Sequence, residues 1–239
     1  MKEHIVSSFD RDLEGIQAQI MKMGGLVEQA IRDATQSLET RDEELSEKVR
    51  RGDKAIDALD EMIHEDAARV IALRAPTAID LRVILSVMKI SSDLERIGDL
   101  AKNLAKRNSV LMQLTIIDGA TAALRRMARE VELMLKDGLD AYIQRDSALA
   151  RDVILRDRDV DQMYNATFRE FLTFMMEDPR NITACMHLHF IAKNIERMGD
   201  HVTSVAEQVV FLVDGEMPEA RKKGDNTSVD KSLSPQAGE

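Results

Sequence analysis

The chain has 239 residues, and 43 Asp and Glu against 33 Lys and Arg give it a formal net charge of −10. This acidic balance argues against a nucleic-acid partner, because the protein would repel a phosphate backbone. One cysteine excludes an intrachain disulfide framework. No stretch approaches the ~18 apolar residues of a membrane span, and the first residues lack the features of a secretory signal. We therefore expect a cytoplasmic protein that meets membranes only through partners.

The composition predicts an all-α chain of long helices. Helix-forming residues dominate, while aromatic residues make up 3 % and there are only 4 prolines. Pro76 and Pro179 are expected to end the second helix of each half, because the residue before a proline is pushed out of the α region. Helical stretches are expected near 8–39, 42–74, 77–111, 116–144, 147–177 and 180–213.

An internal duplication relates the two halves of the chain. Asp42, Asp53, Asp57 and Met23 recur 104 positions later as Asp146, Asp157, Asp161 and Met127. The spacing drifts to 103 between Pro76 and Pro179, and to 101 between Glu95 and Glu196. A repeat of this length predicts two tandem three-helix bundles, which we place at 1–113 and 114–214. Residues 215–239 are polar and aperiodic, and we expect a disordered tail.

The third helix of each half carries an apolar stripe with alternating spacings of four and three, which is typical of a helix facing a bundle core. Its members in the first half are Val83, Val87, Ile90, Leu94, Ile97, Ala101 and Leu104. Those in the second half are Leu188, Ile191, Ile195, Met198, Val202, Val205, Val209 and Leu212.

Two pentapeptides on these helices nearly repeat each other: 95–99 reads Glu-Arg-Ile-Gly-Asp, and 196–200 reads Glu-Arg-Met-Gly-Asp. Carboxylates four residues apart lie side by side on a helix and repel each other. The apolar stripe places them on or near the outward face, so we expect them at the bundle surface. Because this repulsion between carboxylates occurs in both halves, we predict a cation site at each pair, where a positive charge would offset it. Glycine in mid-helix costs roughly 1 kcal/mol against alanine, which predicts close approach of another helix at Gly98 and Gly199.

The second helix of each half supplies a matching acidic pair. Asp57 lies 19 residues before Pro76 and Glu95 lies 19 after it, so antiparallel packing would bring the two pairs to the same height. Oxygen ligands at a surface suit Mg, Mn, Ca or Fe better than a closed thiolate zinc site. The candidate metal ligands are Asp53, Asp57, Glu95, Asp99, Asp157, Asp161, Glu196 and Asp200.

The alternative is that these acids form a solvated charge network, as most charged helix faces do. The duplication of the acidic pairs favours the interpretation as metal sites. Neighbouring acids such as Asp60 and Glu61, together with His64, are not repeated in the second half. Arg96 and Arg197 either pair with adjacent acids or contact an acidic partner. The sequence has no phosphate-binding glycine loop, nucleophile elbow or cysteine metal motif, so we do not expect an enzyme.

Four motifs resemble the PhoU family. They are Phe9-Asp10-x-x-Leu13 in the opening helix, Pro76-x-x-x-Asp80-Leu81-Arg82, the segment 92–101 followed by Asn103, and the segment 194–201. The resemblance extends over roughly residues 5–214, in the order that the family has. The second half departs from it, because Asn181-Ile182-Thr183 replaces Asp-Leu-Arg and Ser204 stands opposite Asn103. We therefore expect the second carboxylate site to be the weaker one.

The resemblance implies a fold of two tandem three-helix bundles and the role of a phosphate-specific transport system accessory protein. Such proteins act in the cytoplasm between the ATPase subunit of a phosphate ABC transporter and a sensor histidine kinase. They restrain phosphate uptake and the phosphate-starvation response, so the role is one of negative regulation and signal transduction. The resemblance also implies bound divalent or trivalent metal ions, with Mg, Mn, Fe or Zn as candidates, and we expect a homodimer. Arg82, Arg96 and Arg197 are the candidate partner contacts.

Two other functions remain open from the sequence. One is a metal-dependent enzyme that acts on a phosphorylated substrate, with the carboxylates holding Mg or Mn. The other is a plain helical scaffold whose acidic residues only keep it soluble.

Overall fold

The structure is a computed structural model that describes residues 2–76, 78–114, 117 and 119–218, with side chains described from Phe9 onward except that of Asp10. The described chain is built of long helices joined by short turns. Their order is α1 (Lys2–Thr40), α2 (Glu43–Arg74), α3 (Ala78–Leu111), α4 (Ala120–Gln144), α5 (Ser147–Glu177), a short 3₁₀ turn η1 (Pro179–Asn181) and α6 (Ile182–Asp214).

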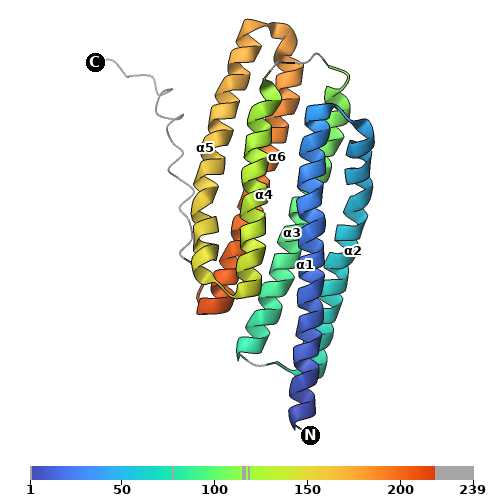
Figure 1. Ribbon diagram of the computed structural model, residues 1–239, viewed down its shortest axis with the longest axis vertical. Helices are drawn as coiled ribbons and strands as arrows, with labels where there is room; N and C mark the ends of the chain where they lie inside the picture. The colour runs from blue at the N-terminus through green and yellow to red at the C-terminus, as the bar shows by residue number, and fades with distance from the viewer. Residues whose placement is uncertain (1, 77, 115–116, 118, 219–239) are drawn as a thin grey trace, which may run out of the picture.

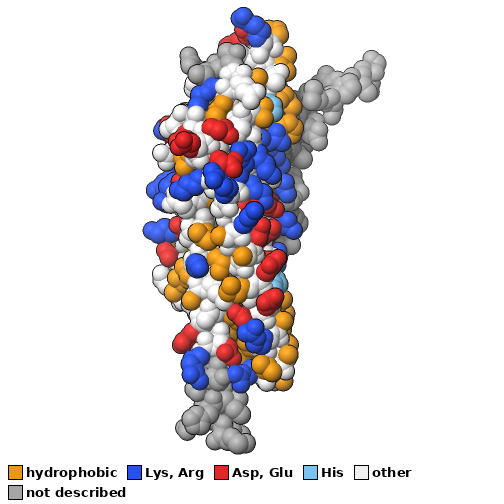
Figure 2. Space-filling view, turned by 90° about the vertical axis from the view of Figure 1, so that its right-hand side faces the viewer, with side chains coloured by type: hydrophobic (Ala, Val, Ile, Leu, Met, Phe, Trp, Pro, Cys, Tyr) orange, Lys and Arg blue, Asp and Glu red, His pale blue; other side chains and the backbone are white. Residues whose placement is uncertain are grey.

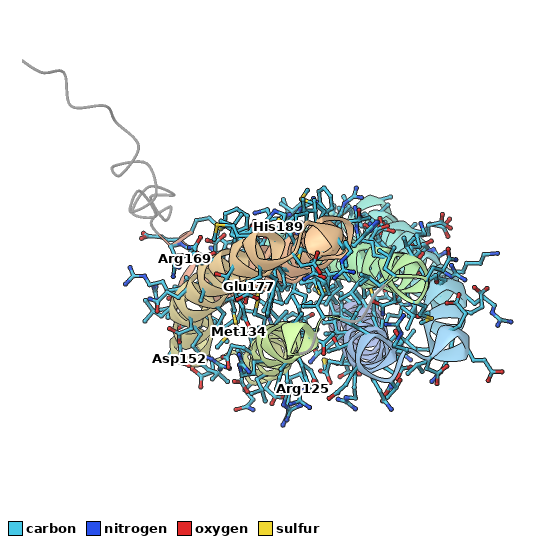
Figure 3. The ribbon with its side chains drawn as sticks, turned by 90° about the horizontal axis from the view of Figure 1, so that it is seen from above. Arg125, Met134, Asp152, Arg169, Glu177 and His189 are labelled. Carbon is cyan, nitrogen blue, oxygen red and sulfur yellow. The ribbon has the colours of Figure 1, made fainter. Side chains whose placement is uncertain are left out.

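Each half forms a three-helix bundle, and the two bundles lie side by side along their length (Figure 1). Viewed from above, α1 and α4 lie in one layer and α3 and α6 in the other, with α2 and α5 at the two sides (Figure 3). The bundles meet where α3 packs against α6 and α1 against α4. Because α3 and α6 run in opposite directions, the α2–α3 turn and the α5–α6 turn lie at opposite ends of the molecule. The all-α class and the tandem bundles expected from the sequence are confirmed.

The first turn of each half has the same construction. Asp42 and Asp146 cap α2 and α5: the carboxylate of Asp42 accepts from the backbone N–H of Leu45, and that of Asp146 accepts from two backbone N–H groups. A capping carboxylate satisfies donors that the first helical turn leaves unpaired. Arg41 and Arg145, which precede the caps, have φ values of 54° and 55°. This left-handed conformation reverses the chain within two residues.

The observed helix bounds correct several expectations. The first helix begins at Lys2, about two turns earlier than the segment 8–39 that we expected. The fourth begins at Ala120 because Gly119, at φ 82°, holds the left-handed conformation that glycine adopts without steric cost. The other helices begin and end within two residues of expectation. The expected division between residues 113 and 114 falls between α3 and α4 and stays a prediction. The expected tail lies outside the described residues beyond residue 218.

One apolar core runs through both bundles. Every residue of the two predicted stripes is buried except Val83, which is partly buried against the same core. Met134 of α4 lies within the interior, while Arg125 and Asp152 lie on the outside (Figure 3). Between the halves, Arg32 of α1 forms an ion pair with Glu132 of α4. The two halves are therefore joined by a continuous apolar core and by an ion pair between α1 and α4. Within the described residues, no helix is long and apolar enough to span a membrane.

Candidate functional site

The structure brings the first set of predicted carboxylates together between α2 and α3. Asp53 is buried, with 5 % of its surface exposed, while Asp57, Glu95 and Asp99 are half-buried. We call these four residues the first patch. The sequence placed them at the bundle surface, which holds for three of them. Asp53 instead lies beneath the surface, and its Oδ1 atom has no hydrogen-bond partner among the described residues.

Burial, with like charge adding to it, raises the pKa values of two carboxylates of the first patch, Asp57 and Glu95. Burial raises the pKa of Glu95, and the negative charges of Asp99 and Asp57 add to the rise against the opposing charge of Arg96. Burial likewise raises the pKa of Asp57, and Asp53 adds to that rise. Because these groups interact across α2 and α3, the predicted convergence of the two acidic pairs is confirmed for this half.

The second set lies between α5 and α6 with the same pattern of burial. Asp157 is buried at 3 % exposure, and Asp161, Glu196 and Asp200 are half-buried. These four residues form the second patch. Burial raises the pKa of Glu196; the ammonium of Lys193 opposes the rise, while Asp200 and Asp161 add to it. Each patch thus has one carboxylate in the interior and three at the rim.

The mid-helix glycines let the helices of each patch approach closely. A Cβ atom on Gly98 would lie 3.0 Å from Cδ1 of Ile56 on α2, and one on Gly199 would lie 3.2 Å from Oδ1 of Asp157 on α5. These separations are tighter than ordinary contacts between non-bonded carbon and oxygen atoms. The glycines therefore set the spacing between the two helices, and Gly199 also leaves room for the buried carboxylate.

Two lysines belong to the patches and were missed from the sequence. Lys102 of α3 donates to Asp53 Oδ2 and, at 2.6 Å, to Asp99 Oδ1, so its ammonium joins both helices. In the second patch, Lys193 donates to Glu196 Oε2 at 2.6 Å, on the same helix. Lys102 follows Asp99 by three residues and Lys193 precedes Glu196 by three, so helical spacing alone could have identified both.

The donor chemistry of the patches fits a hard cation, since carboxylate oxygens converge and one of them is buried and unpartnered. Binding a metal ion without rearrangement would also require these side chains to be positioned for coordination already. Within the described residues, no group of three His, Cys, Asp or Glu side chains stands ready to hold a metal ion. Metal binding would therefore require side-chain movement, and in the first patch it would require Asp53 and Asp99 to leave Lys102.

The three arginines expected to contact partners lie in different surroundings. Arg96 is largely exposed, and its guanidinium approaches Glu95 Oε2 at 3.4 Å and Asp99 Oδ2 at 3.7 Å. Arg197 is exposed at the corresponding position on α6. Arg82 instead lies over the ring of Phe211, 5.5 Å from its centroid, and so holds the start of α3 to the end of α6.

A polar network that the sequence did not indicate joins α3 to α6 between the bundles. Asp93 is 1 % exposed and accepts from His201 Nδ1 at 2.9 Å, from Ser204 Oγ at 2.6 Å and from Lys89. Burial opposes ionisation, yet these hydrogen bonds hold the pKa of Asp93 below its ordinary value. Ser204 gives its only hydroxyl proton to Asp93. A serine nucleophile would give that proton to a histidine base, so this trio is not arranged as a catalytic triad.

The surface around the first patch is more basic than that around the second. On the face that α2 occupies, Lys and Arg side chains form a band across the upper half, with Asp and Glu side chains both above and below it (Figure 2). Exposed Lys and Arg residues of α2 and α3 include Lys48, Arg51, Lys54 and Lys106, and we call these four residues the basic band. The corresponding positions of the second half, in the same order, hold Asp152, Leu155, Arg158 and Glu207. The bundles therefore share a scaffold but present different charges.

The fold and the two carboxylate patches define a duplicated helical-bundle protein, and comparison with known proteins gives its family. The PhoU domain model matches residues 20–107 and again 124–209, one match for each bundle. The chain belongs to the PhoU family.

Curated relatives match nearly end to end. A phosphate-specific transport system accessory protein PhoU homolog of Caulobacter vibrioides is 45 % identical over 216 residues, which is 90 % of this chain and 94 % of the relative. The Rhizobium meliloti homolog is 43 % identical over 226 residues, 94 % and 95 % of the two chains. The crystal structure of PhoU from Pseudomonas aeruginosa matches with a TM-score of 0.84 at 37 % identity, covering 87 % of this chain and all of that one.

Proposed function

We propose that this protein is a non-enzymatic regulatory adaptor of a phosphate-specific transport system, acting in the cytoplasm. Its partners are the ATPase subunit of a phosphate ABC transporter and the sensor histidine kinase of the phosphate response, and it restrains both uptake and the starvation response. The observation that carries this proposal is the match of both bundles to relatives named as accessory proteins of such a system.

We further propose that the two carboxylate patches hold divalent or trivalent metal ions, with Mg, Mn, Fe or Zn as candidates. Two features support this: each patch repeats four carboxylates, and Asp53 Oδ1 is buried without a partner among the described residues. Burial raises the pKa values of Glu95 and Glu196, neighbouring carboxylates add to the rise, and a bound cation would offset both effects by stabilising the charged forms. The homodimer expected from the resemblance stays a prediction, which light scattering of the purified protein tests.

Deletion of the gene tests the regulatory role. Without the protein, phosphate-responsive genes should become active in phosphate-rich medium, and repression there that persists after deletion would contradict the proposal. Wild-type protein supplied in trans should restore repression. The binding of purified ATPase subunit and kinase, each measured with and without phosphate, then tells which partner the protein contacts.

Patch variants separate the metal sites from the adaptor role. One variant carries Glu95→Ala and Asp99→Ala, and another carries Glu196→Ala and Asp200→Ala. A matched control removes two exposed acids of α5 outside the patches, Asp159 and Glu170. Protein purified without chelators should lose metal in the patch variants and keep it in the control. Unchanged metal content would contradict the metal sites. Turnover of phosphorylated substrates that only the patch variants lose would favour the enzyme instead.

A further inference from the structure

A cavity of about 220 Å³ lies between the two bundles, at the end of the molecule where α1 and α3 end and α4 and α6 begin (Figure 1). Much of its wall is apolar and buried, and this part is made by Leu38, Leu111, Ala120, Ala184 and Leu188. Exposed Glu39 and Gly119 also line the cavity, which therefore opens to solvent. Since an apolar cavity of about 150 Å³ can hold a benzene molecule, this one has room for a small organic molecule.

Asn108 of α3 adds a buried polar group to the wall of this cavity. It is 1 % exposed, and its Nδ2 atom donates to the carbonyl of Ala34 at 3.0 Å and to Ser37 Oγ at 2.7 Å. The reverse orientation of the amide would set its oxygen against the carbonyl of Ala34, so these contacts fix the side chain. Its Oδ1 atom has no hydrogen-bond partner among the described residues. A buried acceptor without a donor costs stability, and a donor on a bound molecule would remove that cost.

The bundle fold itself does not require polar side chains at this place. In the first half, Ser37 accepts from Asn108 and also from Ser46 of α2, at 3.1 Å, so the three side chains form one buried cluster. Their counterparts, at an offset of 104 for the two serines and 101 for the asparagine, are apolar and buried: Ala141, Ala150 and Val209. The second bundle thus closes the same place with apolar side chains alone. The polar cluster beside the cavity therefore points to a role other than packing.

We infer that this cavity is a binding site for a small organic molecule that has a compact apolar body and one hydrogen-bond donor. The apolar body gains dispersion contacts with the leucines of the wall, and the donor pairs with Asn108 Oδ1. None of the residues of the two patches lines the cavity, so the inference depends neither on metal binding nor on the adaptor role. Because the wall comes from both bundles, a bound molecule contacts both halves of the chain.

Indole is a suitable probe, because it has a compact apolar body and a single N–H group. The protein has no tryptophan, so the fluorescence of indole reports its transfer to an apolar site without a background from the protein's own indole groups. Benzofuran has nearly the same shape, with an oxygen atom in place of the N–H group. Calorimetric titration of the full-length protein measures the affinity for each probe.

Indole should bind at least about tenfold more tightly than benzofuran, which corresponds to about 1.4 kcal/mol. The reason is that benzofuran leaves Asn108 Oδ1 unpaired. A cavity without a free acceptor would instead favour benzofuran, which gives up no N–H hydrogen bond to water on binding.

Three substitutions locate the site. Asn108→Val introduces the residue of the second half and should abolish the preference for indole while benzofuran still binds. Ala184→Leu fills the cavity and should abolish the binding of both probes. Asn103→Val, the same change at an exposed position of α3, is the matched control and should alter neither affinity. Circular dichroism checks that each variant is folded.

Failure of indole to bind, or binding no tighter than that of benzofuran, would overturn the inference. It would also be overturned by an Asn108→Val protein that keeps the full preference for indole, or by an Ala184→Leu protein that still binds both probes. The comparison of the two probes on the unaltered protein needs no substitution, so it decides the question even where a variant does not fold.

Discussion

The two bundles of this chain have the same backbone arrangement and differ in some of the side chains that they carry. Both use an aspartate cap at the first turn, a mid-helix glycine at a close contact between two helices and one buried carboxylate within the patch. They differ in the contacts of the patch lysine, because Lys102 joins Asp53 and Asp99 across two helices, whereas Lys193 pairs with Glu196 on its own helix. They differ also in surface charge, since the four positions of the basic band hold two acids, a leucine and one arginine in the second half.

This difference shows which features a duplication keeps. Features that the backbone requires recur at the same spacing, because a change there costs stability in either half. Side chains around the patches are free to diverge, so these positions are where the halves can acquire different roles. The four predictions below test the comparison, from the largest expected effect to the smallest.

We expect the largest effect on stability at a core position where the two halves differ in the size of the side chain. Phe171 of α5 is fully buried, and the corresponding position on α2 is the smaller Ala67. Phe171→Ala gives the second half the side chain of the first without the surrounding packing that fits it, and should cost about 3–5 kcal/mol of unfolding free energy. Urea unfolding followed by circular dichroism measures the loss. Phe168→Ala, at a half-buried site, is the control and should cost less. A loss below about 1 kcal/mol for Phe171→Ala would show that the halves pack interchangeably.

The network between the bundles gives the next largest effect. Asp93 corresponds to Asn194 in the second half, so Asp93→Asn makes the two halves alike. It removes a buried charge that accepts from His201, Ser204 and Lys89, and should cost about 1–3 kcal/mol at pH 7. Asp80→Asn, an exposed acid on the same helix, should change stability little.

The pH dependence of this loss follows from the lowered pKa of Asp93. A carboxylate whose pKa is lower in the folded state contributes stability above its unfolded pKa of about 3.9, and that contribution is lost as pH falls through the folded value. The advantage of wild type over Asp93→Asn should therefore be full at pH 5 to 7 and should shrink below about pH 4. An advantage independent of pH would mean that packing, not charge, carries the effect.

The sequence predicted the repeated parts of the molecule well, because periodicity and proline positions act locally. The apolar stripe from Val87 to Leu104 and the meeting of Asp57 with Glu95 followed from helical spacing and the position of Pro76. The predicted start of α1 was wrong, because Ser8, a residue type that often caps a helix, lies within the helix, which begins at Lys2.

The network around Asp93 could not be predicted from the spacing used for the patches. It joins residues 108 and 111 positions apart on helices of different bundles. Its geometry depends on how the bundles pack together, and one-dimensional patterns do not encode that arrangement. The burial of Asp53 and Asp157 was missed for a related reason: the depth of a side chain beside a helix contact depends on how closely Gly98 and Gly199 let the helices approach.

The helix caps give a smaller effect that should be nearly equal in the two halves. Asp42→Ala and Asp146→Ala should each cost about 1 kcal/mol, as loss of a capping aspartate usually does. Asp146→Ala should cost somewhat more, because its carboxylate accepts from the N–H groups of both Ala148 and Leu149, whereas that of Asp42 accepts from one. Asparagine at either position should restore most of the loss. Thermal unfolding of the four variants measures the difference, and a larger loss at Asp42 would contradict the prediction.

The smallest effect tests the charge balance of the patches in chelator-treated protein at pH 7. Because the pKa of Glu95 is raised in the folded state, its charge costs stability as pH rises from about 4.3, the unfolded value, through the raised value. Glu95→Gln removes that cost and should stabilise the metal-free protein by a few tenths of a kcal/mol, the size of one like-charge pair on a helix. Glu196→Gln should gain less, because it also loses the ion pair with Lys193.

Both gains in stability should vanish at pH 4, where Glu95 and Glu196 of the wild-type protein are already mostly protonated. Thermal unfolding at pH 7 and pH 4 gives the comparison, with Glu170→Gln as an exposed control on α5. A gain for Glu95→Gln that persists at pH 4 would mean that the glutamine packs better, and that charge is not the cause. A greater gain at Glu196 than at Glu95 would mean that Lys193 does not offset the repulsion in the second patch, and the contrast drawn between the two lysines would fail with it.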